Sequence, residues 1–181
     1  VLERGLPTII DADALTVLST DGDLRELVRD HPCAVLTPHA GEFERLYAET
    51  LGRELDLSEG LGVRLRELSD ALDCFILHKG RITTVTAPGQ KIYGMNAGHS
   101  YAATAGSGDV LSGILGATLA QLDAAEADAE AIIMEILHAA AIHQHAAAIA
   151  AHTPDGFGLC SASQIAARVP QAIARLLLMQ R

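Results

Sequence analysis

The sequence contains no tryptophan, and aromatic residues make up only 3% of its 181 residues, so any hydrophobic core is aliphatic. Hydrophobic residues nonetheless reach 49%, which is enough to fill the core of one domain of this length. Much of this apolar content is alanine and leucine, which are strong helix formers. We therefore expect a chain that is rich in helices.

Cysteine is also scarce. The three cysteines, Cys33, Cys74 and Cys160, are far apart, odd in number and without CxxC spacing. This pattern argues against a disulfide framework and against a structural zinc site. We predict buried free thiols in a reducing compartment.

Basic residues are few, and the formal net charge is -10 at pH 7. Such a charge disfavours non-specific binding to nucleic acid or to anionic lipid. We also find no apolar stretch of the length of a membrane span and no basic-then-apolar leader. The sequence thus predicts a cytoplasmic protein that binds neither nucleic acid nor membrane.

Apolar strand-like runs alternate with helical spacing through the first half, as in a chain of β-α-β units. We predict strands at 7–11, 33–37, 73–78, 82–86 and 90–93, the last two forming a hairpin at one sheet edge. We predict helices at 22–30, 40–52, 60–71, 108–122, 126–151 and 168–179, and a short helix before the last one that Ser161 or Ser163 could cap. Residues 1–181 should form one compact α/β unit. Because an interior strand follows almost directly on the first residue, we expect an upstream part of the domain to be absent from this sequence.

A segment of small residues precedes the helix predicted at 108–122 and reads A-T-A-G-S-G-D from Ala103 to Asp109. Glycine lets backbone N–H groups approach a ligand closely, and a helix start adds positive partial charge. Such a turn suits a phosphoryl group, and Asp109 beside it could take a proton from an attacking hydroxyl. On composition alone, helix capping by Ser107 or Asp109 explains the segment equally well.

The stretch from His99 to Gly113 reads H-S-Y-A-A-T-A-G-S-G-D-V-L-S-G and resembles the anion-hole signature of the NAD(P)H-hydrate dehydratase family. This family belongs to the ribokinase-like superfamily, which is related to carbohydrate kinases. Three segments match the family in the same order: I-D-A-D-A-L at 10–15, L-T-P-H-A-G-E at 36–42 and L-H-K-G at 77–80. The resemblance implies a ribokinase-like three-layer sandwich, a mostly parallel sheet flanked by helices. This chain would be its C-terminal two-thirds, with the N-terminal part missing.

The resemblance also implies roles for individual residues. Asp109 would be the catalytic base, in an anion hole that also includes Gly106, Ser107 and Gly108. Asp109 and His39 would contact the hydrated dinucleotide, and Glu42 would help to hold a water-coordinated Mg²⁺, an ion that prefers few carboxylates and several waters. ADP or ATP would lie against the residues of the next strand end and the turn, namely Lys79, Gly80, Arg81, Ile82, Thr83 and Gly108.

Several of these residues have a plainer explanation. Glu42 would also interact favourably with the dipole of a helix that begins at Gly41, and Lys79 could be an exposed lysine at a strand end. Asp11 and Asp13 could orient substrate or metal waters, but we favour helix capping or support for at least one of them.

Some positions depart from the family pattern. His99 to Ala102 replace residues of N-P-G-M type, and Ala105 replaces a glycine. Arg81 and Ile82 replace small residues, which leaves the adenosine contacts open. Four further histidines, His138, His143, His145 and His152, invite a metal site, but without a suitably spaced carboxylate we interpret them as packing or interface residues.

The resemblance implies repair of hydrated NADH or NADPH, a lyase reaction in which a nucleotide-dependent dehydration passes through a phosphorylated intermediate. It further implies assembly into homo-oligomers. Two alternatives remain: a small-molecule kinase of the same superfamily acting on a sugar, vitamin or alcohol, and a non-catalytic nucleotide-binding fragment. The L-T-P-H-A-G-E segment favours the dehydratase, since sugar kinases usually carry Asn-x-x-Glu there.

Overall fold

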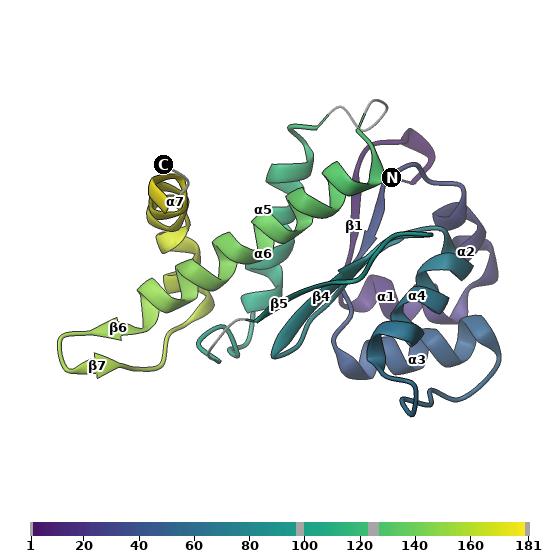
Figure 1. Cartoon of the computed structure of the whole chain (residues 1–181), viewed down its shortest axis with the longest axis horizontal. Coiled ribbons are helices and arrows are strands. Elements are labelled where there is room, and N and C mark those ends of the chain that lie inside the picture. Colours follow the sequence, from purple (N-terminus) through teal and green to yellow (C-terminus); the bar gives the residue numbers. More distant parts are fainter. Residues whose placement is uncertain (1, 97–99, 123–126, 180–181) are drawn as a thin grey trace.

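The computed structural model describes residues 2–96, 100–122 and 127–179. A five-stranded sheet lies between two layers of helices (Figure 1). In sheet order the strands are β1 (Thr8–Ile10), β2 (Ala34–Leu36), β3 (Phe75–His78), β4 (Ile82–Thr86) and β5 (Tyr93–Asn96). The helices are η1 (Leu2–Arg4), α1 (Asp13–Thr20), α2 (Gly22–Arg29), α3 (Ala40–Leu51), α4 (Leu61–Leu72), α5 (Ser107–Leu119), α6 (Ala129–Ala151) and α7 (Ala162–Met179). A short hairpin of β6 (His152–Thr153) and β7 (Gly156–Phe157) separates α6 from α7.

The sheet is parallel from β1 to β3, and β4 pairs antiparallel with both β3 and β5. β4 is therefore the one strand of this sheet, as described, that runs against the others. β2 and β3 are buried at every position, as expected of parallel strands covered by helices on both faces. Their carboxyl ends meet at one edge, where ligands bind in open α/β folds.

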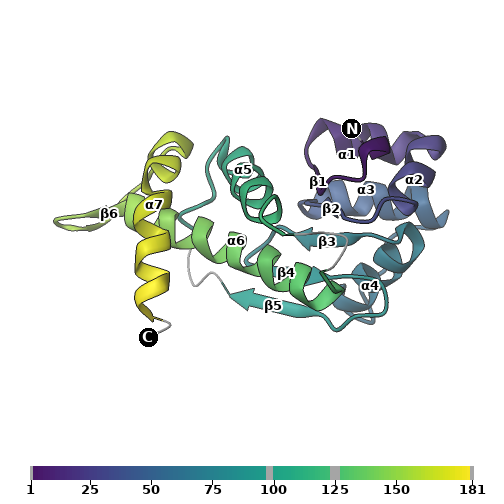
Figure 2. The same cartoon turned by 90° about the horizontal axis from the view of Figure 1, so that it is seen from above.

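Alternate residues of β1, β2 and β3 pack against the two helical layers (Figure 2). Ile76 of β3 packs with Phe43 and Leu65 in the cluster formed by α1 to α4. Its neighbour Leu77 packs on the opposite face with Leu115 and Ile133 of α5 and α6. The three-layer arrangement predicted from the sequence is therefore confirmed.

The clearest differences from prediction concern β5, α1 and α7. β5 begins at Tyr93 and not at 90, because the turn after β4 is longer and is tied to α4 by a hydrogen bond from the Gly89 amide to Asp70 Oδ1 (3.1 Å). α1 was not predicted. Ser161 and Gln164 form the reciprocal side-chain to backbone bonds of a helix start, but the short helix expected there and the helix expected at 168–179 are one continuous helix, α7.

α6 has the length and hydropathy of a membrane span, so the expectation that no segment has this composition is wrong. In the fold, however, its apolar residues are used for packing within the chain. Ile132, Ile133 and Ile136 are buried with the sheet and α5, and Ala146 and Ala147 are buried with residues of α7. Figure 1 shows α6 crossing between α5 and α7 as the central helix of its layer.

All three cysteines are buried free thiols, as predicted. Burial raises the pKa of Cys33 to about 11 and raises the pKa of Cys74 further. The thiols therefore stay protonated and act as small apolar residues of the core.

His78 is a buried polar side chain whose Nδ1 has no hydrogen-bond partner among the described residues. Its ring packs edge-on against Phe43, with 5.6 Å between the ring centroids. Burial, with a smaller contribution from the charge of His39, lowers the pKa of His78 below its usual value. The folded protein therefore holds His78 neutral, while the unfolded chain takes up a proton as the pH falls through about 6.5.

This difference predicts that stability falls with acid. We expect a smaller free energy of unfolding in urea at about pH 5.5 than at about pH 7.5. His78→Leu leaves no unpaired buried nitrogen and should recover about 1 kcal/mol of the loss. His31 and His143, whose pKa values burial also lowers, should keep part of the pH dependence. An unchanged pH dependence in His78→Leu would contradict this assignment.

Candidate functional site

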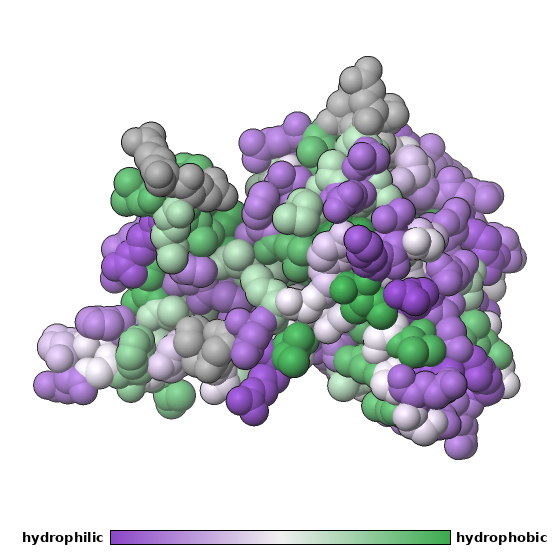
Figure 3. Space-filling view, in the orientation of Figure 1, coloured by the Kyte–Doolittle hydropathy of each residue, from purple (hydrophilic) through white to green (hydrophobic). Residues whose placement is uncertain are grey.

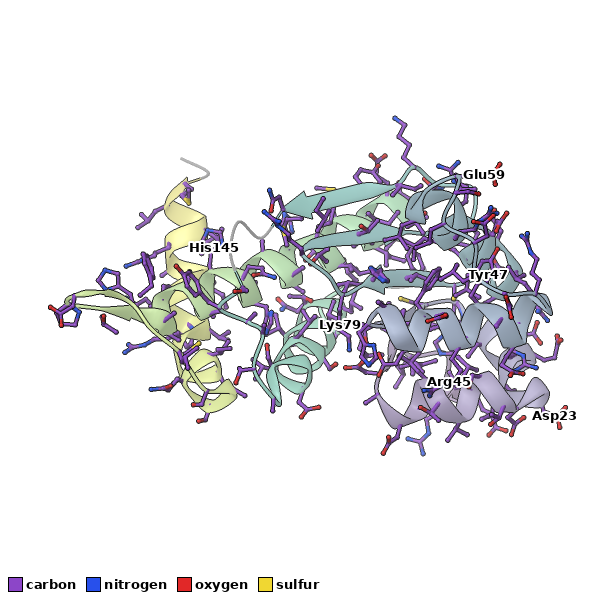
Figure 4. The ribbon with its side chains drawn as sticks, turned by 90° about the horizontal axis from the view of Figure 1, so that it is seen from below. Asp23, Arg45, Tyr47, Glu59, Lys79 and His145 are labelled. Atoms are coloured by element: carbon purple, nitrogen blue, oxygen red, sulfur yellow. The ribbon has the colours of Figure 1, made fainter. Side chains whose placement is uncertain are left out.

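Three strand ends and the start of α5 meet at one edge of the sheet (Figure 1). Asp11 follows β1, Glu42 lies in the first turn of the helix after β2, and Lys79 follows β3. An isolated parallel bridge joins His39 to Lys79, and the Lys79 amide donates to the Pro38 carbonyl (2.8 Å). In Figure 4 the Lys79 side chain lies between the sheet and α5. The structure therefore brings the predicted strand-end residues together.

Lys79 is held mainly by Asp11. Its Nζ lies 2.6 Å from Asp11 Oδ1 and 3.8 Å from Glu42 Oε2. Asp11 Oδ2 accepts a further bond from Ser112 Oγ of α5 (2.9 Å). Burial raises the pKa of the Asp11 carboxyl, but the hydrogen bonds from Lys79 and Ser112 outweigh burial and leave the pKa below its usual value. An ionised carboxylate thus joins β1, β3 and α5.

The predicted anion turn forms the start of α5. Gly106 is the residue before the helix and has φ 80°, a left-handed conformation that favours glycine. A Cβ built on Gly108 would lie 3.8 Å from Lys79 Nζ, so the ammonium stands directly beside the first turn. Asp109 is exposed in this turn, and its Oδ2 lies 4.0 Å from the Cβ position of Gly106. The first turn of α5 therefore has an ammonium beside Gly108 and an exposed carboxylate beside Gly106. Free first-turn amides together with these two groups suit a phosphoryl group.

His143 supports this turn from α6. Its Nε2 lies 2.9 Å from Ser107 Oγ, and both side chains are buried. Burial lowers the pKa of His143, so the ring is neutral and forms an uncharged hydrogen bond. We had interpreted His143 only as a packing residue; the structure identifies it as a contact of the anion turn.

The other histidines take local partners. His138 Nδ1 lies 3.5 Å from Glu135 Oε1, and His145 Nδ1 lies 2.9 Å from the Ala141 carbonyl. His152 packs edge-on against Phe157. Within the described ranges, no three His, Cys, Asp or Glu side chains group in a way that could hold a metal ion.

His39 and Glu42 form a capping box at the start of α3. His39 Nδ1 accepts from the amides of Gly41 (3.1 Å) and Glu42 (3.3 Å), and Glu42 Oε2 accepts from the His39 amide (2.8 Å). Since Nδ1 is the acceptor, the neutral ring carries its hydrogen on Nε2, which lies 3.4 Å from Glu42 Oε1. The His39 side chain is 60% exposed and can offer this N–H to a ligand.

The donor set at this edge fits Mg²⁺. This ion takes one or two carboxylates and completes its shell with waters and phosphate oxygens. Glu42 supplies one carboxylate at this edge, with Oε2 3.8 Å from Lys79 Nζ, whereas both oxygens of Asp11 are already bonded to Lys79 and Ser112. Glu42 thus caps the start of α3 and also lies at a position suited to a metal.

The remaining predicted nucleotide residues run from the turn after β3 into β4. Arg81 is exposed, and so is Ile82, the first residue of β4, with a relative exposure of 55%. Thr83 is buried in β4, where it pairs with Met95 of β5. Gly80 lies against the His78 ring, with 3.6 Å between its Cβ position and His78 Cε1.

A cleft of about 510 Å³ adjoins the anion turn. It is lined by Ser100, Tyr101, Ala103, Thr104, Phe157, Gly158, Leu159 and Cys160. The rings of Tyr101 and Phe157 stack with 5.0 Å between their centroids. Aromatic residues are rare in this chain, so an aromatic residue close to the small residues before α5 could have indicated a binding surface. The sequence analysis did not identify Tyr101 or Phe157. His99, where the family resemblance begins, lies outside the described residues.

A family model described as NAD(P)H-hydrate dehydratase matches residues 1–167. The bifunctional NAD(P)H-hydrate repair enzyme Nnr of Corynebacterium glutamicum is 40% identical to the chain over 193 residues, covering 97% of the chain and 33% of that protein. The ADP-dependent (S)-NAD(P)H-hydrate dehydratase of Neisseria meningitidis serogroup B is 39% identical over 115 residues, covering 64% and 38%. The chain thus spans little more than a third of the length of these curated relatives.

Two solved structures resemble the fold. A ribokinase-like superfamily protein of Enterococcus faecalis matches with a TM-score of 0.70 at 23% identity, covering 92% of this chain and 52% of that one. The ADP/ATP-dependent NAD(P)H-hydrate dehydratase of Bacillus subtilis, co-crystallised with ATP/Mg²⁺, matches with a TM-score of 0.60 at 23% identity, covering 78% and 47%. At such identities the likeness establishes the ribokinase-like fold.

Proposed function

The chain belongs to the NAD(P)H-hydrate dehydratase family, and we propose that the protein repairs hydrated NADH or NADPH by nucleotide-dependent dehydration. ADP or ATP is the phosphoryl donor. The main support is the site geometry: the Lys79 ammonium lies beside Gly108 at the helix start, and the exposed Asp109 carboxylate stands in the same turn. Asp109, Gly106, Ser107 and Gly108 are the proposed catalytic group.

In the first step, the hydroxyl oxygen of the hydrated ring attacks the terminal phosphorus of the nucleotide. The phosphoanhydride bond breaks, and AMP leaves from ADP or ADP leaves from ATP. Asp109 accepts the hydroxyl proton. The first-turn amides and Lys79 stabilise the charge on the transferring phosphoryl group, where preorganised donors contribute most.

In the second step, the carbon–oxygen bond breaks and inorganic phosphate leaves with the bonding electrons. The lone pair of the ring nitrogen assists, and loss of a proton from the neighbouring carbon restores the double bond of NADH or NADPH. His39 is the proposed substrate contact, through the Nε2–H of its exposed ring, which lies 3.4 Å from Glu42 Oε1. Its tautomer is fixed by α3 and needs no adjustment on binding.

Glu42 would hold Mg²⁺ at this edge. When bound, the ion would neutralise charge on the nucleotide phosphates. The nucleotide would extend along Lys79, Gly80, Arg81, Ile82 and Thr83, of which Thr83 is buried in β4. The stacked Tyr101 and Phe157 offer a flat apolar surface for its base within the cleft that adjoins the turn.

We also propose that residues 1–181 form the C-terminal part of one ribokinase-like domain in a cytoplasmic homo-oligomer that binds neither nucleic acid nor membrane. Near its end α7 exposes Leu177, Leu178 and Met179, with relative exposures of 58%, 69% and 76%. Figure 3 shows hydrophobic surface over α7. A second copy of the protein is the proposed cover for this face.

Repair is tested by incubating the full-length protein with hydrated NADPH, Mg²⁺ and ADP or ATP. We expect the near-ultraviolet absorbance of reduced nicotinamide to return, with one phosphate released per molecule restored. A phosphorylated alcohol that accumulates without this absorbance would identify a kinase instead. ADP that raises the melting temperature without any turnover would identify a non-catalytic nucleotide-binding protein.

A further inference from the structure

Asp11 connects three separate elements of the site. It follows β1, its Oδ1 lies 2.6 Å from Nζ of Lys79 after β3, and its Oδ2 lies 2.9 Å from Oγ of Ser112 in α5. Asp11 does not cap α1, because no side chain makes a cap bond at the start of that helix. Both carboxylate oxygens are used in binding Lys79 and α5, so of the two roles expected here, capping or support, Asp11 has the supporting one.

The backbone next to Asp11 is strained, and it helps to hold the Asp11 carboxylate in contact with Lys79. Ala12 has φ 52° and ψ -123°, a conformation that a residue with a Cβ rarely adopts. Such a residue costs about 1–3 kcal/mol and persists only where its surroundings enforce it. The Ala12 amide donates to Asp11 Oδ1 (2.9 Å), so the strained turn holds the carboxylate against Lys79.

Two carboxylates compete for the Lys79 ammonium. Asp11 Oδ1 lies at 2.6 Å, and Glu42 Oε2 lies at 3.8 Å. A lysine ammonium is a point charge on a flexible stem, so it follows the stronger carboxylate partner. If Asp11 lost its charge, Lys79 would pair with Glu42 and would neutralise the carboxylate proposed for Mg²⁺.

We propose that Asp11 is a positioning residue that keeps Lys79 beside Gly108 and prevents it from pairing closely with Glu42, the carboxylate proposed for the metal. This inference rests on the proposed function for the identity of the ligands. Asp11 acts through Lys79 and Glu42 and does not itself take part in the proton transfer.

The test is a double-mutant cycle in the full-length protein. Asp11→Asn keeps the size of the side chain and removes its charge. We expect it to raise the Mg²⁺ concentration needed for half-maximal ADP binding about tenfold, as a lost outer contact of a metal site does. In a protein that already carries Lys79→Met, Asp11→Asn should hardly change this Mg²⁺ concentration further, because no ammonium remains to move. Calorimetric titration of ADP at several Mg²⁺ concentrations measures this without turnover.

Asp13→Asn is the matched control, since Asp13 is an exposed carboxylate two residues further along the chain. It should leave the Mg²⁺ dependence unchanged. Ser112→Ala removes the contact to α5 but keeps the Asp11 charge, so it should change the melting temperature more than the Mg²⁺ dependence.

Three results would overturn the inference. The first is that Asp11→Asn raises the Mg²⁺ concentration for half-maximal ADP binding by the same factor with and without Lys79→Met. The second is an Asp11→Asn variant that differs from the wild type only in melting temperature, and the third is a wild type that binds no ADP. Failure of the proposed function is a different observation, namely binding of ADP and Mg²⁺ by a wild type that restores no reduced nicotinamide. The binding cycle still decides the role of Asp11 in that case.

Discussion

Asp109→Asn should lower kcat for NADPH restoration by about 10²- to 10⁴-fold, the usual contribution of a general base. The amide keeps the shape of the side chain but no longer accepts a proton from the ring hydroxyl. Because Asp109 is exposed, its replacement should leave the melting temperature near that of the wild type. ADP binding should persist, since the turn amides and Lys79 remain. Single-turnover kinetics with hydrated NADPH measure the effect.

Asp23→Asn is the matched control for this variant. Asp23 is also an exposed aspartate in the first turn of a helix, α2, but Figure 4 places it far from Lys79. It should retain wild-type kcat. Undiminished kcat in Asp109→Asn would exclude Asp109 as the base and would leave only its favourable interaction with the dipole of α5.

Gly106→Ala should reduce the free energy of unfolding by about 1–3 kcal/mol. Gly106 has φ 80°, and an added Cβ would lie 3.2 Å from Ala162 Cβ at the start of α7. Both the strain and the crowding would shift the anion turn, so the KM for the nucleotide should rise as well. Urea unfolding and nucleotide titration of the same preparation separate the two effects.

Gly116→Ala provides the control within the same helix. Gly116 has an exposed position in α5, and no atom lies within 4 Å of its Cβ position. An alanine there should increase the free energy of unfolding by about 0.5–1 kcal/mol through helix propensity. If Gly106→Ala were equally stabilising, the left-handed turn described here would be wrong.

The parallel strands and most helices could be predicted because hydrophobic periodicity is local. Apolar runs identified β1 to β3, and the sequence also placed His39, Glu42 and Lys79 at their carboxyl ends. Their meeting at one edge then follows from the parallel arrangement. The small residues before α5 predicted the anion turn for the same reason, because these residues and the start of the helix are neighbours in the sequence.

The supporting contacts could not be predicted in this way. Lys79 and Asp11 are 68 residues apart, Ser112 and Asp11 are 101 apart, and His143 and Ser107 are 36 apart. No local pattern specifies such pairs, since they depend on how β1, α5 and α6 pack. The sequence therefore left capping, support and ligand orientation open for Asp11, because its partners Lys79 and Ser112 follow β3 and lie in α5.

The predicted starts of β5 and α7 were wrong for another reason. A hydrogen bond between a side chain and the backbone lies near each start and has no counterpart in the hydrophobic periodicity. For β5 it joins the Gly89 amide to Asp70, and for α7 it joins Ser161 to Gln164. Periodicity alone placed α7 at 168, where the apolar spacing becomes clear. The capping box begins the helix earlier.

A crystal structure of the full-length protein with ADP and Mg²⁺ tests the central claim most directly. We predict terminal phosphate oxygens within about 3.2 Å of first-turn amides of α5, with the Asp109 carboxylate facing the same phosphate. A nucleotide whose phosphates lie away from this turn, or an Asp109 side chain directed away from them, would contradict the account.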